Sequence, residues 1–253
     1  MGQDLAIFAA GMWAGAINVL VGSGALVTFP TLLFLGYPPL VANISNNIGV
    51  VAGGLTGVHG YRRELRGNGH VVKMLLPASI LGAITGAGLL FVLPEESFET
   101  IVPALIGLGV LMVLIGPLVQ RRTRRRGPVL ERTRLSPLLW LGIFGTGVYG
   151  GYFGAAQGVI LTGLMGLFLS LNLQRITGIK NVLATGVNAT AALTFIVFAN
   201  SYIDWKVVGL IAGGSVIGAA ISARYGRRLP APVLRGMIVT IGLTAIVKIV
   251  FFG

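Results

Sequence analysis

The 253-residue chain contains no cysteine, two histidines and few charged side chains. Without cysteine there can be no disulfide, thiolate ligand or thiol nucleophile, and His59 and His70 alone do not make a clustered metal site. Charged residues make up 10% of the chain, against about 25% in soluble domains. Hydrophobic residues make up 55%, and the mean hydropathy is +0.88. These values predict an integral membrane protein without a metal or other cofactor.

Acidic residues are scarce, with 7 Asp and Glu against 19 Lys and Arg. In a soluble chain this excess of positive charge would suggest a nucleic-acid partner. Here the basic residues lie mostly in short connections between apolar runs, as expected where positive charge is retained on the cytoplasmic side. We therefore expect a lipid bilayer around the chain and no nucleic-acid partner. No Asp or Glu falls inside an expected span, so a buried carboxylate relay is not indicated.

Most of the apolar sequence divides into segments that are long enough to span a membrane. A bilayer core about 30 Å thick needs about 20 helical residues, and six segments meet this length, at 40–59, 74–93, 100–119, 176–199, 207–223 and 236–252. Two further regions, 5–36 and 137–171, are too long for one span and short for two, and glycine interrupts each. We expect each to form a hairpin. A re-entrant pair of half-helices is favoured over two thin spans, because residues 25–36 would reach only about 18 Å as helix.

The two glycine-broken regions open two similar halves of the chain. GSGALVTFPTLLFLGYPPLVANISNNIGV in the first half resembles GAAQGVILTGLMGLFLSLNLQRITGIKNV in the second, and three spans follow each stretch. Residues 1–119 would then form a first repeat, 120–136 a basic linker and 137–253 a second repeat. This duplication predicts an all-α inverted-repeat transporter, with a glycine-broken hairpin and three transmembrane helices in each half.

Corresponding loops of the two halves carry opposite charge. Connections 60–73, 120–136 and 224–235 are rich in Lys and Arg and are predicted to be cytoplasmic. By contrast, PEESFE at 94–99 is acidic, and 200–206 holds a single basic residue. This opposite charge of corresponding loops is expected if each half crosses the membrane an odd number of times. The second half would then be inverted, and both termini would lie outside.

The glycine breaks themselves suggest a binding site. A break in the hydrocarbon survives only where its backbone groups face protein or water. Near Gly24 and Gly158, glycine allows the bend, and the half-helix that follows would turn free N–H groups and its positive dipole end inward. Such groups suit an anion, and breaks entering from opposite faces would meet near the midplane. Close packing is the alternative explanation for any single glycine, but it does not account for a duplicated break.

Polar side chains lie in and after each break. When the two halves are aligned, Asn47 falls opposite Asn181 and Asn46 opposite Lys180. Because lipid offers no hydrogen bonds, such side chains usually face the protein interior or a cavity. Asn43 and Asn188 belong to the same polar set, and the candidate substrate-binding residues are Ser23, Gly24, Asn46, Asn47, Gln157, Gly158, Lys180 and Asn181. A lysine that reaches the membrane interface, and asparagines that only join helices, are the alternatives.

These motifs resemble the sulfite exporter family of the TauE/SafE type, also called the toluene sulfonate uptake permease family. The resemblance covers nearly the whole chain and rests on GSGALVTFP, LGYPPLVANISNNIG, GYRREL, GGYFGAAQG and LQRITGIKNVLA. Ser23 and Ala25 depart from the glycine-richest form of the first loop, and the second loop lacks its proline. The resemblance implies a bacterial-type inner-membrane carrier for sulfite, organosulfonates or related small anions, often acting in export.

The same residues are compatible with other functions. A passive anion channel lined by the same broken helices fits the lack of intramembrane acid, and a carrier of a non-sulfur organic anion fits the same site. A serine hydrolase would need a base near Ser23, but both histidines fall in or beside a predicted cytoplasmic connection, so we expect no enzyme. A purely structural membrane protein would not explain paired breaks. A homo-oligomer is compatible with this architecture.

Overall fold

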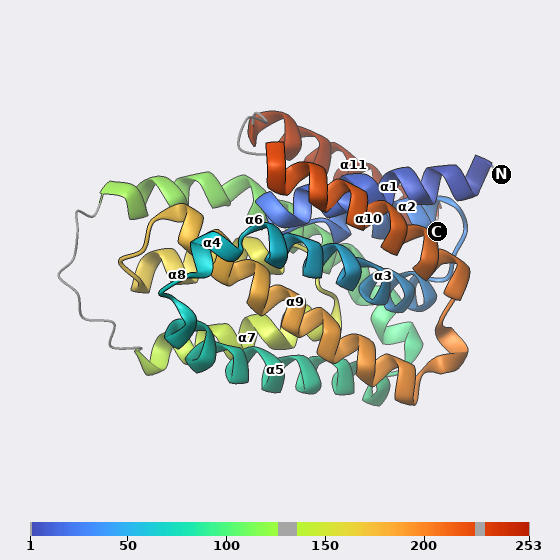
Figure 1. Ribbon diagram of the computed structural model, residues 1–253. Helices are drawn as coiled ribbons and strands as arrows, with labels where there is room; N and C mark the ends of the chain where they lie inside the picture. Colours follow the sequence, from blue (N-terminus) through green and yellow to red (C-terminus); the bar gives the residue numbers. More distant parts are fainter. Residues whose placement is uncertain (1, 126–135, 226–230, 253) are drawn as a thin grey trace.

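The computed structural model describes residues 2–125, 136–225 and 231–252, and every regular element within them is helical (Figure 1). The first half contains α1 Gly2–Leu20, α2 Ala25–Phe34, α3 Pro39–Gly60, α4 Arg62–Leu65, α5 Gly69–Val92 and α6 Glu95–Arg125. The second half contains α7 Pro137–Tyr152, α8 Gln157–Phe168, α9 Leu173–Phe198, the short η1 Asn200–Tyr202, α10 Trp205–Tyr225 and α11 Ala231–Phe252. The predicted all-α membrane fold is confirmed.

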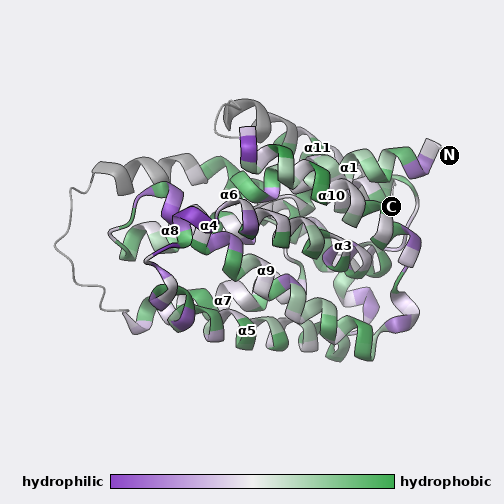
Figure 2. Cartoon of the chain, in the orientation of Figure 1, coloured by the Kyte–Doolittle hydropathy of each residue, from purple (hydrophilic) through white to green (hydrophobic). Residues whose placement is uncertain are grey.

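Five helices in the described ranges are long and apolar enough to cross a membrane, namely α1, α5, the Glu95–Gly116 part of α6, α9 and α10. Hydrophobic residues follow the length of these helices, whereas α4 is hydrophilic (Figure 2). α1 was expected as one arm of a re-entrant hairpin, but its 19 residues are enough to span. α2 has 10 residues and covers only about 15 Å. α3 has 22 residues but is not among the five, because buried asparagines lower its hydropathy.

Helix ends differ from the expected ranges at the charged connections. α6 begins at Glu95 and runs to Arg125, so it includes most of PEESFE and the first arginines of the expected linker 120–136. Glu95 and Glu96 lie in its first turn, where negative charge stabilises the helix dipole. The connection 60–73 contains α4 and the start of α5. Of the linker and the connection 224–235, residues 126–135 and 226–230 lie outside the described part of the chain.

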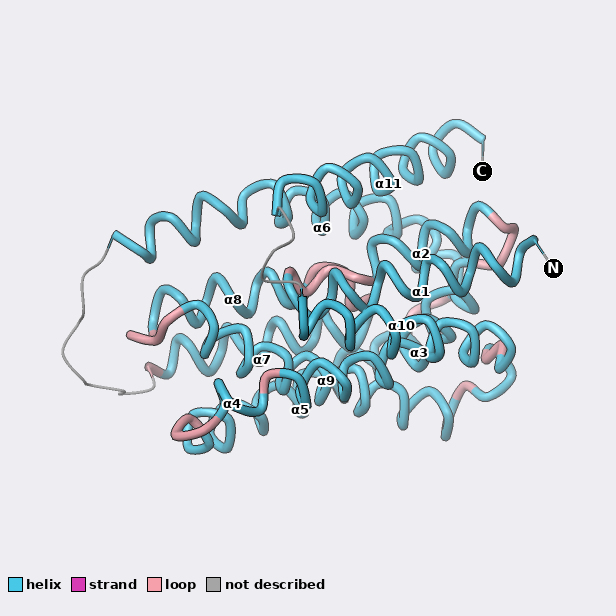
Figure 3. The backbone as a smooth tube through the Cα atoms, turned by 45° about the horizontal axis from the view of Figure 1, so that its top comes forward, coloured by secondary structure: helices cyan, strands magenta, loops and turns pink. Residues whose placement is uncertain are grey.

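The helices of the two halves pack in matching pairs. α1 packs along α10 and α7 along α5, while α3 packs against α10 and α9 against α5. α3 also contacts α9, and α6 contacts α11, along one side of the molecule in Figure 3. If α1 corresponds to α7, α3 to α9, α5 to α10 and α6 to α11, then the α1–α10 contact corresponds to α7–α5, and the α3–α10 contact to α9–α5. The α3–α9 and α6–α11 contacts each join two corresponding helices. α2 lies on the side of the N-terminus and α8 on the opposite side (Figures 1 and 3). The helix contacts thus have a twofold pattern between the two halves of the chain.

Glycines let the paired helices approach closely. A Cβ added at Gly86 of α5 would overlap the Val148 carbonyl oxygen of α7. At Gly218 of α10, the equivalent position in the second half, it would overlap the Met12 carbonyl oxygen of α1. Small residues at such positions allow close contact between membrane helices. For these two glycines, close packing is therefore the explanation, and it recurs in both halves.

We expect Gly86→Ala to lower the thermal unfolding midpoint of the detergent-solubilised protein, because overpacking typically costs about 1–3 kcal/mol. Gly88→Ala in the same helix is the matched control, since nothing lies within 4 Å of a Cβ added there. Thermal unfolding followed by intrinsic fluorescence compares the two variants. Equal midpoints would mean that α5 and α7 are packed less closely than the structure shows.

Candidate functional site

The first break separates α1 from α2. The Val21 and Gly22 N–H groups both donate to the Ile17 carbonyl, over 2.7 and 3.1 Å, and so end α1. Gly22 has φ +85°, in the left-handed region that favours glycine. The chain then turns into α2. Three N–H groups at the head of α2 have no hydrogen-bond acceptor in the described part of the chain, those of Ser23, Gly24 and Ala25.

The second break repeats this geometry at the equivalent place in the second half. The Phe153 and Gly154 N–H groups both donate to the Tyr149 carbonyl, over 2.9 and 3.1 Å, and Gly154 has φ +81°. Ala156 has φ +61°, a conformation that is uncommon for a residue with a side chain. At the head of α8, the N–H groups without an acceptor among the described residues are those of Ala155, Ala156 and Gln157.

The two breaks touch each other. The Gly158 N–H donates to the Gly22 carbonyl over 3.0 Å, and a Cβ added to either glycine would overlap the Cα of the other. Two backbones therefore meet where two side chains would not fit. The sequence predicted the Gly158 N–H as a free donor to an anion, but in this structure that N–H is used to join the halves.

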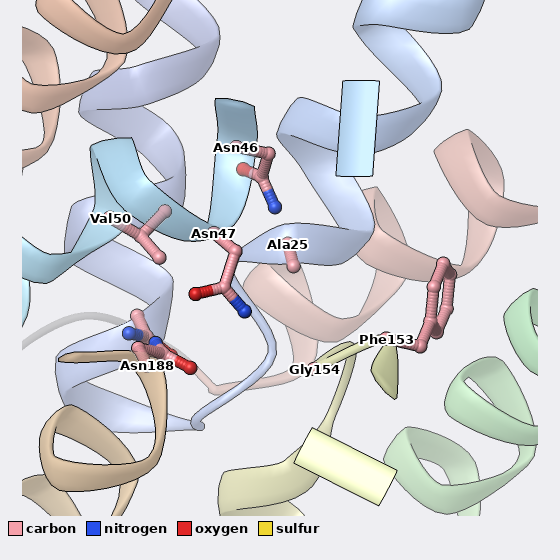
Figure 4. A pocket seen from close by; sticks show the side chains of 8 residues that line it. Ala25, Asn46, Asn47, Val50, Phe153, Gly154 and Asn188 are labelled. Carbon is pink, nitrogen blue, oxygen red and sulfur yellow. The ribbon is translucent and has the colours of Figure 1, made fainter. Parts of the chain in front are cut away.

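A small pocket lies between the breaks, and both halves contribute to it. Its lining consists of Asn18, Ala25, Asn46, Asn47, Val50, Phe153, Gly154 and Asn188. The amide of Asn47 extends toward the space near Ala25, Gly154 and Asn188 (Figure 4). Asn47 is 3% exposed, and its Oδ1 has no hydrogen-bond partner. The pocket therefore holds a buried amide that is free to contact a ligand.

The eight predicted site residues are all buried, and two of them line this pocket. Asn47 points into it, and Asn46 beside it accepts a hydrogen bond from the Thr28 hydroxyl. Gln157 does not line the pocket, but its Nε2 donates a hydrogen bond to Oδ1 of the lining residue Asn188 over 2.7 Å. The structure thus brings these amides from α3, α8 and α9 to one place.

Ser23, Gly24 and Asn181 are buried but are not among the residues that line the pocket. Ser23 Oγ and Asn181 Nδ2 have no hydrogen-bond partner. Such an atom costs about 1–3 kcal/mol. These two groups are therefore candidates for ligand contact in another conformation of the chain.

Lys180 is 1% exposed and does not reach the membrane interface. Its Nζ donates to the carbonyls of Asn18 and Val19, over 2.8 and 3.0 Å. Both carbonyls belong to the last turn of α1, where a cation stabilises the negative end of the helix dipole. Lys180 therefore ties α9 of the second half to the broken end of α1, and the interfacial alternative is wrong. It also places positive charge behind Asn18, a residue of the pocket lining.

Asn18 is a lining residue that the sequence did not single out. Aligning Gly22 with Gly154 places Gly150 opposite Asn18 and Gln157 opposite Ala25. Gln157 Oε1 occupies the space that a Cβ on Gly150 would need. In addition to the asparagines of α3 and α9, each break has one amide of its own: Asn18 before the first break and Gln157 after the second. The available signal was one asparagine in the apolar run AINVLVG.

An aromatic cluster adjoins the pocket at Phe153. Phe153, from the pocket lining, packs edge-on against Phe29, with ring centroids 5.1 Å apart. Phe98 and Tyr149 each have ring centroids 6.4 Å from that of Phe153. Phe98 lies near the start of α6, soon after Glu95. The cluster therefore connects the pocket lining to the first turns of α6.

The sequence matches the family described as "Sulfite exporter TauE/SafE" over residues 7–249. The chain belongs to this family. Family membership makes this TauE/SafE chain a multi-pass membrane transporter, which moves a small molecule through a lipid bilayer. The family predicted from the motifs is confirmed.

Relatives of this TauE/SafE chain carry similar names. "Probable membrane transporter protein" of Haemophilus influenzae is 26% identical over 247 residues, covering 97% of this chain and 93% of the relative. "Probable membrane transporter protein ORF9" of Sinorhizobium sp is 26% identical over 260 residues, covering 98% and 94%. "Probable membrane transporter protein YfcA" of Escherichia coli K12 is 24% identical over 247 residues, covering 97% and 88%. No solved structure matches the chain. The relatives' names indicate transport and specify no substrate.

Proposed function

We propose that this TauE/SafE chain carries sulfite or organosulfonates across a bacterial inner membrane, with export favoured. The observation that carries the proposal is the contact between the two breaks, beside a buried pocket that Ala25 at the head of α2 lines together with Phe153 and Gly154 of the second break. The Ala25 N–H has no hydrogen-bond acceptor among the described residues. Such N–H groups bind oxyanions, and the pocket amides add donors. The family description supplies the sulfur oxyanion.

Transport would proceed by rocking of two inverted repeats, residues 1–119 and 137–253, around this pocket. The matching helix pairs and the left-handed glycine at the same place in each break, Gly22 and Gly154, support this mechanism. The pocket walls come from both halves, so any relative movement of the repeats would change access to the site. The aromatic cluster around Phe153 would close one end in the present conformation, which favours a carrier over an open channel.

We further propose that both termini and η1 face outside and that the connection 60–73 faces the cytoplasm. An ion pair of 2.7 Å joins Lys206 to Asp4, so α10 and α1 begin at the same end of the molecule. We expect Ser201→Cys, at an exposed position, to react with a membrane-impermeant thiol reagent on intact cells. Arg66→Cys, also exposed, should react only after permeabilisation. The cysteine-free parent chain is the blank, and the opposite labelling pattern would reverse the proposed orientation.

Counterflow tests the function. Liposomes containing the purified protein are preloaded with unlabelled sulfite, and the uptake of radiolabelled sulfite is measured against empty liposomes and against liposomes without preload. We expect saturable uptake that the internal anion accelerates. Uptake that does not saturate and ignores the preload would identify a channel. If sulfite and methanesulfonate both fail while acetate enters, the substrate is a non-sulfur organic anion.

A further inference from the structure

We infer that the pocket accepts an oxyanion with one negative charge and excludes a dianion of the same shape. This inference rests on the proposed function, because it assumes that the transported anion binds between the two breaks. It concerns the charge of the substrate, which neither the family description nor the relatives' names specify.

The first observation concerns buried charge. Lys180 is the one buried charged side chain in the part of the chain that the structure describes. All other buried polar side chains there are neutral hydroxyls and amides. The hydrogen bonds of Lys180 go to the Asn18 and Val19 carbonyls. No carboxylate among the described residues pairs with it, so no acidic side chain in those residues offsets a positive charge on Lys180.

The second observation concerns the four helix ends that meet at the breaks. The C-terminal ends of α1 and α7 carry about −0.5 charge each, and the N-terminal ends of α2 and α8 carry about +0.5 each. To first order these partial charges cancel and leave the single charge of Lys180. The carbonyl ends are also occupied, since Lys180 bonds to α1 and Asn43 Nδ2 donates to the Tyr152 carbonyl of α7 over 3.0 Å. At the pocket, the Ala25 N–H at the head of α2 has no hydrogen-bond acceptor among the described residues.

The third observation concerns the pocket amides. Asn46 and Asn188 have their carbonyl oxygens held by Thr28 and Gln157, so their NH₂ groups remain as donors. The carbonyl oxygen of Asn47 is buried and unpartnered, and it can accept a hydrogen bond but not donate one. Neutral donors stabilise the oxygens of an anion but do not balance a second full charge. In a buried site an unbalanced charge is strongly unfavourable, and a dianion would bring one.

Methanesulfonate and sulfate separate charge from shape, because a methyl group replaces one charged oxygen on the same tetrahedral sulfur. Both charges are fixed at neutral pH. In the sulfite counterflow assay with the unmodified chain, we expect methanesulfonate to inhibit uptake and sulfate to inhibit at least tenfold more weakly. Sulfite itself would then be carried as hydrogensulfite. Equal inhibition by sulfate and methanesulfonate would overturn the inference.

A charge added to the pocket provides an independent test. Asn47→Lys places a second cation beside the ligand, and it should shift the ratio of sulfate to methanesulfonate inhibition toward sulfate by at least tenfold. Asn47→Gln, which adds length without charge, should leave the ratio as in the parent chain. A monodisperse Asn47→Lys protein with an unchanged ratio would count against the inference. If neither sulfite nor methanesulfonate enters the liposomes, the proposed function fails; if sulfate enters equally with them, only the charge preference fails.

Discussion

Gly22→Ala should remove most sulfite counterflow and lower the thermal unfolding midpoint of the protein. Gly22 has φ +85°, where a residue with a side chain costs roughly 1 kcal/mol more than glycine. The new Cβ would also overlap Gly158 Cα, and overpacking typically costs about 1–3 kcal/mol. Separating these backbones would break the 3.0 Å hydrogen bond between the halves and displace the walls of the pocket.

Gly36→Ala isolates the contribution of the contact. Gly36 has φ +86°, so alanine meets the same backbone strain, but nothing lies within 4 Å of its added Cβ. The difference between the two variants in unfolding midpoint and in counterflow therefore reports the packing of one break on the other. Equal losses in both variants would show that backbone strain explains everything and that the breaks do not meet closely.

Lys180→Met should reduce sulfite counterflow at least tenfold. The substitution keeps much of the side-chain volume but removes the one buried positive charge in the described residues. It also leaves the Asn18 and Val19 carbonyls without their donor. An unsatisfied buried carbonyl costs about 1–3 kcal/mol, while loss of a buried charge offsets part of that cost. Transport, rather than stability, is therefore the quantity that should change most.

Lys206→Met is the matched control for Lys180→Met. Lys206 carries the same side chain, but it is 67% exposed and pairs with Asp4 at the molecular surface. Surface ion pairs contribute about 0–1 kcal/mol, so transport should stay within twofold of the parent chain. Liposomes are loaded with equal amounts of each variant, and initial rates are compared. Lys180→Met with the counterflow of the parent chain would remove Lys180 from the binding machinery.

Much of the helix pattern was visible in the sequence. Hydropathy placed the expected spans 74–93, 100–119, 176–199 and 207–223 on helices that are long and apolar enough to cross a membrane, because transfer of a segment into lipid depends mainly on its own composition. The expected spans 40–59 and 236–252 also coincide with helices, α3 and α11, but neither is among these five. Some boundaries were missed. α6 extends to Arg125, well into the expected basic linker, since arginine is a good helix former and a span need not end where its apolar residues end. The inverted orientation of the second half stays a prediction.

The polar site residues could also be found from sequence, but their roles could not. Asn46 and Asn47 stood out as amides in an apolar span, and both line the pocket. Asn18 did not stand out, although it lines the same pocket. In the second half a glycine, Gly150, stands at the position equivalent to Asn18, and the amide is instead supplied by Gln157. Such compensation involves positions in different helices, and no local pattern shows it.

By itself, the sequence determined that this is a helical membrane transporter of the TauE/SafE family with a repeated, glycine-broken hairpin. These properties follow from the free energy of short segments in lipid and from motifs within one segment. Only the tertiary structure decided that Gly158 bonds to Gly22 and that Lys180, far along the chain from Asn18, caps α1. A hydrogen-bond partner is chosen by the packing of all helices together, because a buried donor takes whichever acceptor the fold brings within reach.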